Sequence, residues 1–115
     1  MSRALGAESE ARAAQLLQRK GYLIADRNWT CRGGEIDLVC LDGDTLVFVE
    51  VRARKDSSHG SPLETVGGVK RRRLIRAAKI YLHEKQLWEK ACRFDVVAID
   101  GDEVTHLEDA FQTTS

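Results

Sequence analysis

Two carboxylates in apolar segments are the residues of this sequence best placed to do chemistry. Asp37 precedes the apolar stretch 38–41, and Glu50 lies in the otherwise apolar run 46–51. Burying a carboxylate in an apolar strand costs several kcal/mol unless it is paired or binds a metal. Because the two acids lie a similar distance from the Asp42-Gly43-Asp44 turn, a hairpin would bring them together. Converging carboxylates predict a site for Mg²⁺, or for Mn²⁺, since both metals favour carboxylate oxygens.

A purely structural interpretation of Glu50 stays open. Its carboxylate can form an ion pair with Arg52, Arg32 or Arg93 and have no further role. The combination of Asp37 with Glu50, followed closely by Arg52, favours a functional site over an isolated ion pair.

The segments that must position these acids form a predicted α/β fold. Residues 4–20 are rich in helix-forming residues and are predicted to form a helix that ends at Gly21. Alternating apolar and polar residues predict strands over 22–30, 35–41, 45–53, 93–99 and 103–107. A second helix is expected over 69–90, and Ser, Gly and Pro in residues 54–68 predict a mobile loop. The order is α-β-β-β-α-β-β, and the length of 115 residues predicts one domain, residues 1–115.

Periodicity assigns residues to faces of these elements. In the first hairpin strand, Glu35 and Asp37 should share one face, while Ile36, Leu38 and Cys40 share the other. In the second strand, alternation predicts that Leu46, Phe48, Glu50 and Arg52 share one face. Helical spacing places Leu5, Ala11, Ala14 and Leu17 toward the core.

Basic residues are concentrated in the middle of a chain that is neutral overall. Lys and Arg number 18, as do Asp and Glu, yet residues 52–79 hold nine basic residues against two acidic ones. Such segregation of charge predicts that the protein binds a polyanion such as nucleic acid and recognises its backbone. The alternative is that the basic residues form a solvated helix face that binds nothing. The candidate nucleic-acid-binding residues are Arg54, Lys55, Lys70, Arg71, Arg72, Arg73, Arg76 and Lys79.

The cysteines and the apolar runs indicate a cytoplasmic protein. Cys31, Cys40 and Cys92 are odd in number and have no metal-binding spacing, so we expect reduced thiols and no zinc site. No apolar run is long enough for a membrane helix, and the first residues lack the apolar stretch of a signal peptide. We therefore expect no membrane partner.

The motif around the two acids resembles a known nuclease signature. Asp37 followed by Glu50-Val51-Arg52 is similar to the Asp…(Asp/Glu)-x-Lys signature of the PD-(D/E)xK nuclease superfamily. The segments Arg32-Gly33-Gly34-Glu35-Ile36-Asp37-Leu38, Val47-Phe48-Val49-Glu50-Val51-Arg52 and Arg93-Phe94-Asp95-Val96-Val97 resemble the YraN-like family of small bacterial proteins, which are related to Holliday-junction resolvases. The resemblance also includes Gly6, Glu10-Ala11, Gly21, Asn28 and Lys70, and extends to about Phe111.

This resemblance implies a fold, an activity and a set of site residues. The fold would be restriction-endonuclease-like, a mixed sheet with flanking helices. Asp37 and Glu50 match the two metal-binding acids, and Glu10 matches the acid on the first helix that completes the metal site, with Glu8 a lesser candidate. Arg52 occupies the position of the usual Lys, and Lys70 matches a basic position that opens the second helix. Glu35 and Asp95 match family positions whose role could be structural.

Three functions remain open at this point. The first is a Mg²⁺-dependent, structure-selective endonuclease that acts on DNA, including branched DNA, with a homodimer expected by analogy. Arg52 cannot serve as a general base because its pKa exceeds about 12, so the second is a nucleic-acid-binding module without catalysis. The third is a scaffold protein whose basic helix docks an acidic partner.

Overall fold

The fold is a five-stranded sheet with one helix on each face. The computed structural model describes residues 2–54 and 67–111, with side chains from 7 to 53 and from 67 to 111. The elements are α1 (Ser2–Arg19), β1 (Leu23–Cys31), β2 (Gly34–Asp42), β3 (Thr45–Arg54), α2 (Gly68–Glu84), β4 (Cys92–Asp100) and β5 (Glu103–Phe111). This order and the mixed α/β class confirm the prediction. Neither helix, as far as it is described, has the length and apolar character needed to cross a membrane.

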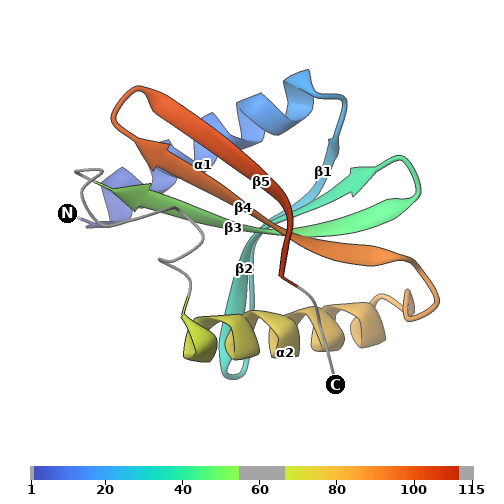
Figure 1. The fold of residues 1–115 in the computed structure, drawn as a ribbon. Helices are drawn as coiled ribbons and strands as arrows, with labels where there is room; N and C mark the ends of the chain where they lie inside the picture. Colours follow the sequence, from blue (N-terminus) through green and yellow to red (C-terminus); the bar gives the residue numbers. More distant parts are fainter. Residues whose placement is uncertain (1, 55–66, 112–115) are drawn as a thin grey trace.

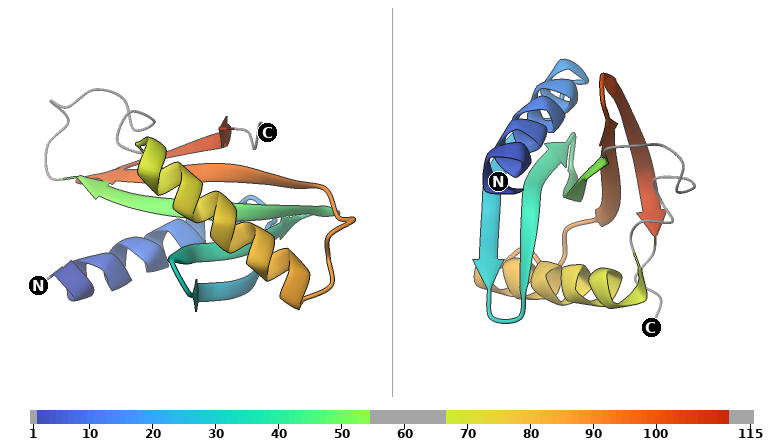
Figure 2. Two further views of the ribbon diagram at one scale, coloured as in Figure 1. Left: turned by 90° about the horizontal axis from the view of Figure 1, so that it is seen from below. Right: turned by 90° about the vertical axis from the view of Figure 1, so that its left-hand side faces the viewer.

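The sheet is mixed because one connection is a crossover. Its strands lie in the order β1-β2-β3-β4-β5, and every neighbouring pair is antiparallel except β3 with β4. The chain between these two parallel strands includes α2, as such a pairing requires. Figures 1 and 2 show α1 on one side of the sheet and α2 on the other.

Two apolar clusters attach the helices to the sheet. Leu46 and Phe48 of β3 pack with Leu74 and other residues of α2, whereas Val47 and Val49 pack with the face of α1 that carries Leu17. Fully burying each large apolar side chain contributes about 1.5–3 kcal/mol. The alternation predicted for β3 is therefore confirmed, and it directs Glu50 to the side of α2.

The alternation predicted for β2 is wrong at Asp37. Ile36 belongs to the cluster beneath α2, while Leu38 and Cys40 belong to the cluster beneath α1. The cause is a kink in the neighbouring strand, where Asn28 lies opposite Asp37 and adopts a positive φ of 52°. A left-handed residue interrupts the regular pleat of a strand, and Figure 2 shows the turn end of the β1–β2 hairpin lying beside α2.

Several predicted boundaries also need correction. α2 ends at Glu84 rather than at residue 90, because Gln86 takes a left-handed φ of 58° and the chain turns there. β5 continues past residue 107 to Phe111. In α1, Ala11 was predicted to face the core but is exposed, and Ala13 is buried in the core instead.

Some expectations fall on parts of the chain that the structure does not describe. The predicted mobile loop at 54–68 lies mostly in residues 55–66, outside the described residues, and its last residue, Gly68, opens α2. The side chain of Leu5 is likewise outside them.

Candidate functional site

The two predicted acids meet where β2 and β3 separate. The ladder between these strands ends at the pair Leu38 and Val49. Beyond it, the Oδ2 atom of Asp37 accepts a hydrogen bond of 2.8 Å from the backbone N–H of Val51. The carboxylate thus takes the place of the missing strand partner, which fixes Asp37 at the fork of the sheet.

Glu50 lies beside Asp37 and is almost completely buried. Its side chain hydrogen bonds that of Asp37, and its residue exposure is 3%. The Oε2 atom of Glu50 lies 3.3 Å from Nζ of Lys70 and 3.5 Å from Nη1 of Arg52. Burial, together with the charge of Asp37, raises the pKa of Glu50 to about 7, although Lys70 and Arg52 act in the opposite direction. The predicted convergence of the two acids is present in the structure.

The structural interpretation of Glu50 is also partly present. Of the three predicted ion-pair partners, Arg52 contacts Glu50, while Arg93 instead binds Asp42 and Asp95. The contact with Arg52 does not neutralise Glu50 fully, since the pKa of Glu50 still lies above its ordinary value.

Glu10 of α1 joins the same group of carboxyls. Burial raises its pKa, as do the charges of Asp37 and Glu35, and its side chain hydrogen bonds both Asp37 and Asn28. Glu8 is exposed. We name Asp37, Glu50 and Glu10 the carboxylate site.

Asn28 is a site residue to which the sequence interpretation gave no role. Its side chain interacts with Glu10 and lowers the pKa of that carboxyl, and its backbone adopts a left-handed φ of 52°. Asn is depleted in strands and enriched at positive φ. An Asn within a predicted strand was therefore the available signal.

The carboxylate site has the donor chemistry of a site for a hard divalent cation. Burial is the first cause of the raised pKa of all three acids, and mutual repulsion adds to it for Glu10 and Glu50. A bound cation would relieve that repulsion. Over residues 7–53 and 67–111, no three His, Cys, Asp or Glu side chains already stand close enough together to hold a metal ion. The acids therefore fit Mg²⁺ or Mn²⁺ in type, and binding would require their side chains to move.

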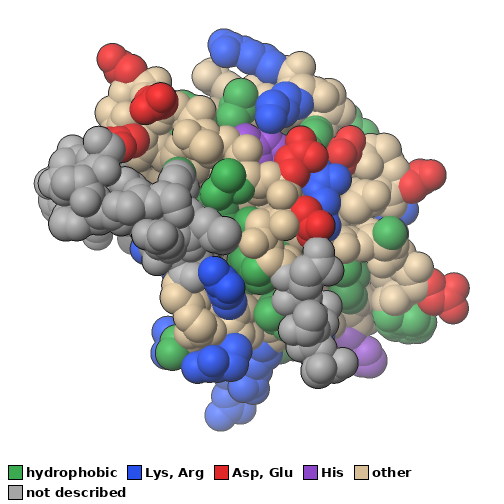
Figure 3. Space-filling model, in the orientation of Figure 1, with side chains coloured by type: hydrophobic (Ala, Val, Ile, Leu, Met, Phe, Trp, Pro, Cys, Tyr) green, Lys and Arg blue, Asp and Glu red, His purple; other side chains and the backbone are tan. Residues whose placement is uncertain are grey.

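Lys70 connects the carboxylate site to a basic surface on α2. Figure 3 shows Lys and Arg side chains gathered over the first turns of this helix. The exposed basic residues there are Arg72, Arg73, Arg76 and Lys79. Arg71 is half-buried, with its guanidinium 5.4 Å from the ring centre of Phe111. The side chains of Arg54 and Lys55 lie outside the described part of the chain.

A second buried carboxylate, Asp95, has a different environment. It accepts hydrogen bonds from Nε of Arg93 at 3.0 Å and from the backbone N–H of Asp109 at 3.0 Å, and it lies 2.8 Å from Nε2 of His106. Burial alone would raise its pKa, but His106, Arg93 and Asp109 together hold the pKa below its ordinary value. Lys20 can only donate to Nδ1 of His106, 2.8 Å away, so Nε2 carries the proton that points to Asp95.

All three cysteine thiols are free, as the sequence predicted. Cys40 is buried, which raises its pKa to about 12 and makes the thiol unreactive.

Comparison with known proteins identifies the family of the chain. Residues 9–99 match the uncharacterised protein family UPF0102. The chain is 50% identical to a UPF0102 protein of Ectopseudomonas mendocina, over 90% of this chain and 88% of that protein. It is 55% identical to a UPF0102 protein of Chromohalobacter salexigens, over 87% and 80% of the two chains. It is 46% identical to a UPF0102 protein of Pseudomonas fluorescens, over 94% and 92%. The chain therefore belongs to the UPF0102 family, the YraN-like family that its motifs resemble.

Proposed function

We propose that this protein is a metal-dependent nuclease that hydrolyses phosphodiester bonds of structured DNA. The observation that carries this proposal is the pair of buried acids Asp37 and Glu50 at the fork of the sheet, with the ammonium group of Lys70 3.3 Å from Glu50 and with Glu10 near enough to feel the charge of Asp37. An isolated structural acid has no need of a second buried acid that raises its pKa, as Asp37 does for Glu50. Oxygen donors next to a cationic side chain are what phosphodiester hydrolysis requires.

Each residue of the site has a distinct role in this proposal. Asp37, Glu50 and Glu10 would hold Mg²⁺ or Mn²⁺, which when bound polarises the phosphoryl oxygen and lowers the pKa of water. The hydrogen bond from Val51 fixes one oxygen of Asp37, so the fork of the sheet determines where the phosphate must lie. A water oxygen attacks phosphorus and gives up a proton to solvent, the bond to the leaving oxygen breaks, and that oxygen takes up a proton, so that one water is consumed.

Lys70 supplies the ammonium group that position 52 lacks. Its Nζ is 3.3 Å from Glu50, slightly closer than Nη1 of Arg52 at 3.5 Å. Both cations can donate hydrogen bonds, but Lys can also give up its proton and so act as a base toward water, whereas Arg stays protonated. We therefore assign charge stabilisation to Arg52 and the orientation of water to Lys70.

The basic surface of α2 would bind the DNA backbone. Its exposed cations follow one another along two turns of a helix that begins at the carboxylate site. Each phosphate neutralised on duplex DNA adds about −0.9 to the slope of log affinity against log salt. We expect each substitution of Arg72 or Arg76 by Gln to reduce that slope by about this amount.

The test is hydrolysis by the purified protein. Flapped, four-way-branched, single-stranded and plain duplex DNA are incubated with Mg²⁺ or Mn²⁺, and products are compared for the wild type and for Glu50→Gln. The control is Glu89→Gln, which removes an exposed carboxylate away from the site. We expect the wild type and the control to cleave and Glu50→Gln to lose at least a hundredfold in rate. Cleavage that survives Glu50→Gln would reject the assignment.

Arg52 favours a second candidate function, a nucleic-acid-binding module without catalysis. Lys70 and Arg52 already partner Glu50, and such pairing suits a retained structural site. This alternative predicts salt-sensitive DNA binding, no hydrolysis with either metal, and no activity after Arg52→Lys. Absence of DNA binding even at low salt would favour a scaffold protein over both candidates.

A further inference from the structure

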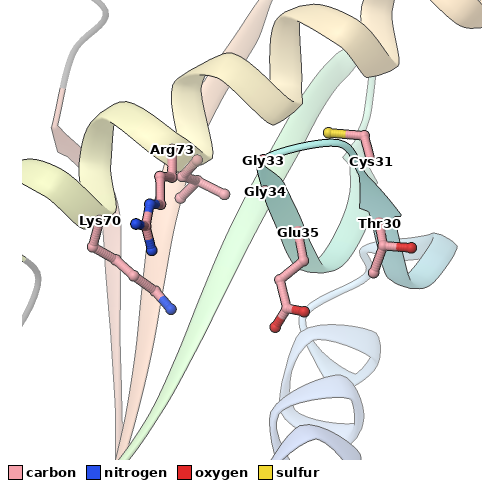
Figure 4. A pocket seen from close by; sticks show the side chains of 8 residues that line it. Thr30, Cys31, Gly33, Gly34, Glu35, Lys70 and Arg73 are labelled. Atoms are coloured by element: carbon pink, nitrogen blue, oxygen red, sulfur yellow. The ribbon is translucent and has the colours of Figure 1, made fainter.

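A cavity of about 480 Å³ lies between the β1–β2 turn and the first turns of α2. Its size falls in the range of small-molecule and cofactor sites, about 300–1,000 Å³. Gly33 and Gly34 form one wall, and Lys70, Arg73 and Leu74 form the opposite wall. Figure 4 shows the side chains of Lys70 and Arg73 extending from α2 on the side that faces the hairpin.

The wall formed by the glycines is set by a close contact between backbone segments. A Cβ atom added to Gly34 would lie 2.9 Å from the backbone oxygen of Arg73 and 3.2 Å from Cβ of Ala77. Only glycine lets the hairpin lie this close to the helix. The cavity therefore has fixed walls, because the hairpin bend and the helix are packed directly against each other.

The charges of the cavity favour an anion. Lys70 and Arg73, one turn apart, face the single carboxylate of Glu35. Arg76 lies just behind the turn, with its guanidinium carbon 3.9 Å from the position of a Cβ at Gly33. Arginine with a neighbouring lysine suits phosphate, which the guanidinium can bind through two parallel hydrogen bonds.

The cavity and the carboxylate site share one side chain. Lys70 lines the cavity, and its Nζ is also 3.3 Å from Oε2 of Glu50. An anion on Lys70 and Arg73 would therefore be a close neighbour of the phosphate at the carboxylates. Leu74, Cys31 and the two glycines add an uncharged surface with room for more than a phosphate.

We propose that this cavity binds one unpaired nucleotide of the substrate strand, next to the bond that is cut. Its phosphate lies on Lys70 and Arg73, and its sugar and base lie against Cys31 and the Gly33–Gly34 wall. The inference rests on the proposed function for its class of substrate. A nucleotide must leave the base stack to enter a cavity, and this costs least when it is already unpaired. The cavity therefore favours a flap, a branch or a single strand over an intact duplex.

The test measures binding of thymidine 5′-monophosphate, inorganic phosphate and thymidine by NMR titration in EDTA. We expect the nucleotide to bind at least tenfold more tightly than either fragment and to shift the amide signals of Gly33, Gly34 and Leu74. Arg73→Gln should weaken the nucleotide and phosphate by about tenfold and leave thymidine unchanged, because one charge-assisted contact is lost. Arg19→Gln removes an exposed cation of α1 and is the matched control.

A second variant tests the cavity without changing its charges. Thr30 is exposed on edge strand β1 and lines the cavity, so Thr30→Trp should fill it and abolish nucleotide binding. Thr105→Trp places the same side chain on the opposite edge strand, β5, and should leave binding unchanged. Urea unfolding midpoints confirm that each variant is folded.

The outcomes separate this inference from the nuclease proposal. Three results would overturn the nucleotide site. The nucleotide could bind no more tightly than phosphate, the signal shifts could be confined to other residues, or binding could survive Thr30→Trp. Because the titration contains no metal and requires no turnover, a protein that binds the nucleotide here but does not cleave DNA would refute only the nuclease.

Discussion

Asp95 and the Asp37–Glu50 pair are both buried carboxylates on neighbouring strands, but their environments are opposite. Asp95 receives donors from Arg93, His106 and a backbone N–H, and its pKa lies below the ordinary value. Glu50 is 3% exposed and has two cations beside it, yet its pKa is raised to about 7. The difference is a second acid: the charge of Asp37 raises the pKa of Glu50, whereas the main influences on Asp95 besides burial are the donors and cations that lower its pKa.

This difference separates a structural role from a functional one. The donors around Asp95 satisfy its charge within the protein, so nothing further is required to stabilise it. The carboxylate site keeps an excess of negative charge that the fold itself does not neutralise. Such uncompensated charge, held in place by the fork of the sheet, is typical of sites that bind a cation or carry out proton transfer.

The largest expected effect is on stability at Asp95. Asp95→Ala leaves Arg93 and His106 without their shared partner inside the protein, and we expect a loss of about 3–5 kcal/mol in the free energy of unfolding. Glu50→Gln should not lower the same quantity at pH 7, because it removes the unfavourable ionisation of a buried carboxyl as well as an attraction. Urea unfolding of both variants measures the two values. Equal losses would show that the two carboxylates have the same structural role.

The pH dependence of stability should also differ between the two regions. The folded pKa of Glu50 is about 7, above its ordinary 4.5, so the folded state binds more protons between these values and stability falls as pH rises through them. We expect Glu50→Gln to remove roughly 1–3 kcal/mol of this decline. Asp95 is ionised in both states over that window, and its stabilisation is lost only as pH falls below its ordinary 3.8. Urea unfolding at pH 4.5–8 tests the prediction, and a wild type with the same slope as Glu50→Gln would contradict it.

Divalent cations should stabilise one region only. A ligand of the folded state at ten times its Kd adds about 1.4 kcal/mol to the free energy of unfolding. For a chain of 115 residues that corresponds to a rise of about 6 °C in Tm. The rise should be larger at pH 8 than at pH 6, because the acids must be deprotonated to bind. Thermal unfolding with Mg²⁺ and Mn²⁺ measures it, and an equal rise in Glu50→Gln would place the cation elsewhere.

The smallest effect concerns the cation that partners Glu50. Lys70→Met removes an attraction that lowers the pKa of Glu50, so we expect this pKa to rise further, by up to about one unit. Carbon-13 NMR of the Glu side-chain carboxyls follows the titration. Lys79→Met removes the same charge from an exposed position of α2 and is the control. An unchanged titration in Lys70→Met would show that Lys70 does not interact with Glu50 in solution.

Local sequence pattern accounts for most of the fold and for the pairing of the two main acids. The alternation of Val47, Phe48 and Val49 orients β3, and the short turn after Asp42 aligns Asp37 with Glu50. The face of Ile36 could not be predicted in this way, because it depends on the left-handed conformation of Asn28 on another strand. The contact of Lys70 with Glu50 depends on tertiary packing of α2, which periodicity does not specify. The motif resemblance identified Glu10 and Lys70 as candidate site residues, and only the structure shows which residues lie next to them.

The parallel pairing of β3 with β4 has a consequence for biosynthesis. Strand β3 can find its partner only after α2 and β4 have been made, and contacts between such distant segments form slowly. A growing chain that has released only α1, β1, β2 and β3 has three acids but no Lys70 held against them. On the proposed function, hydrolytic competence would then arise only after β4 has been made and has paired with β3.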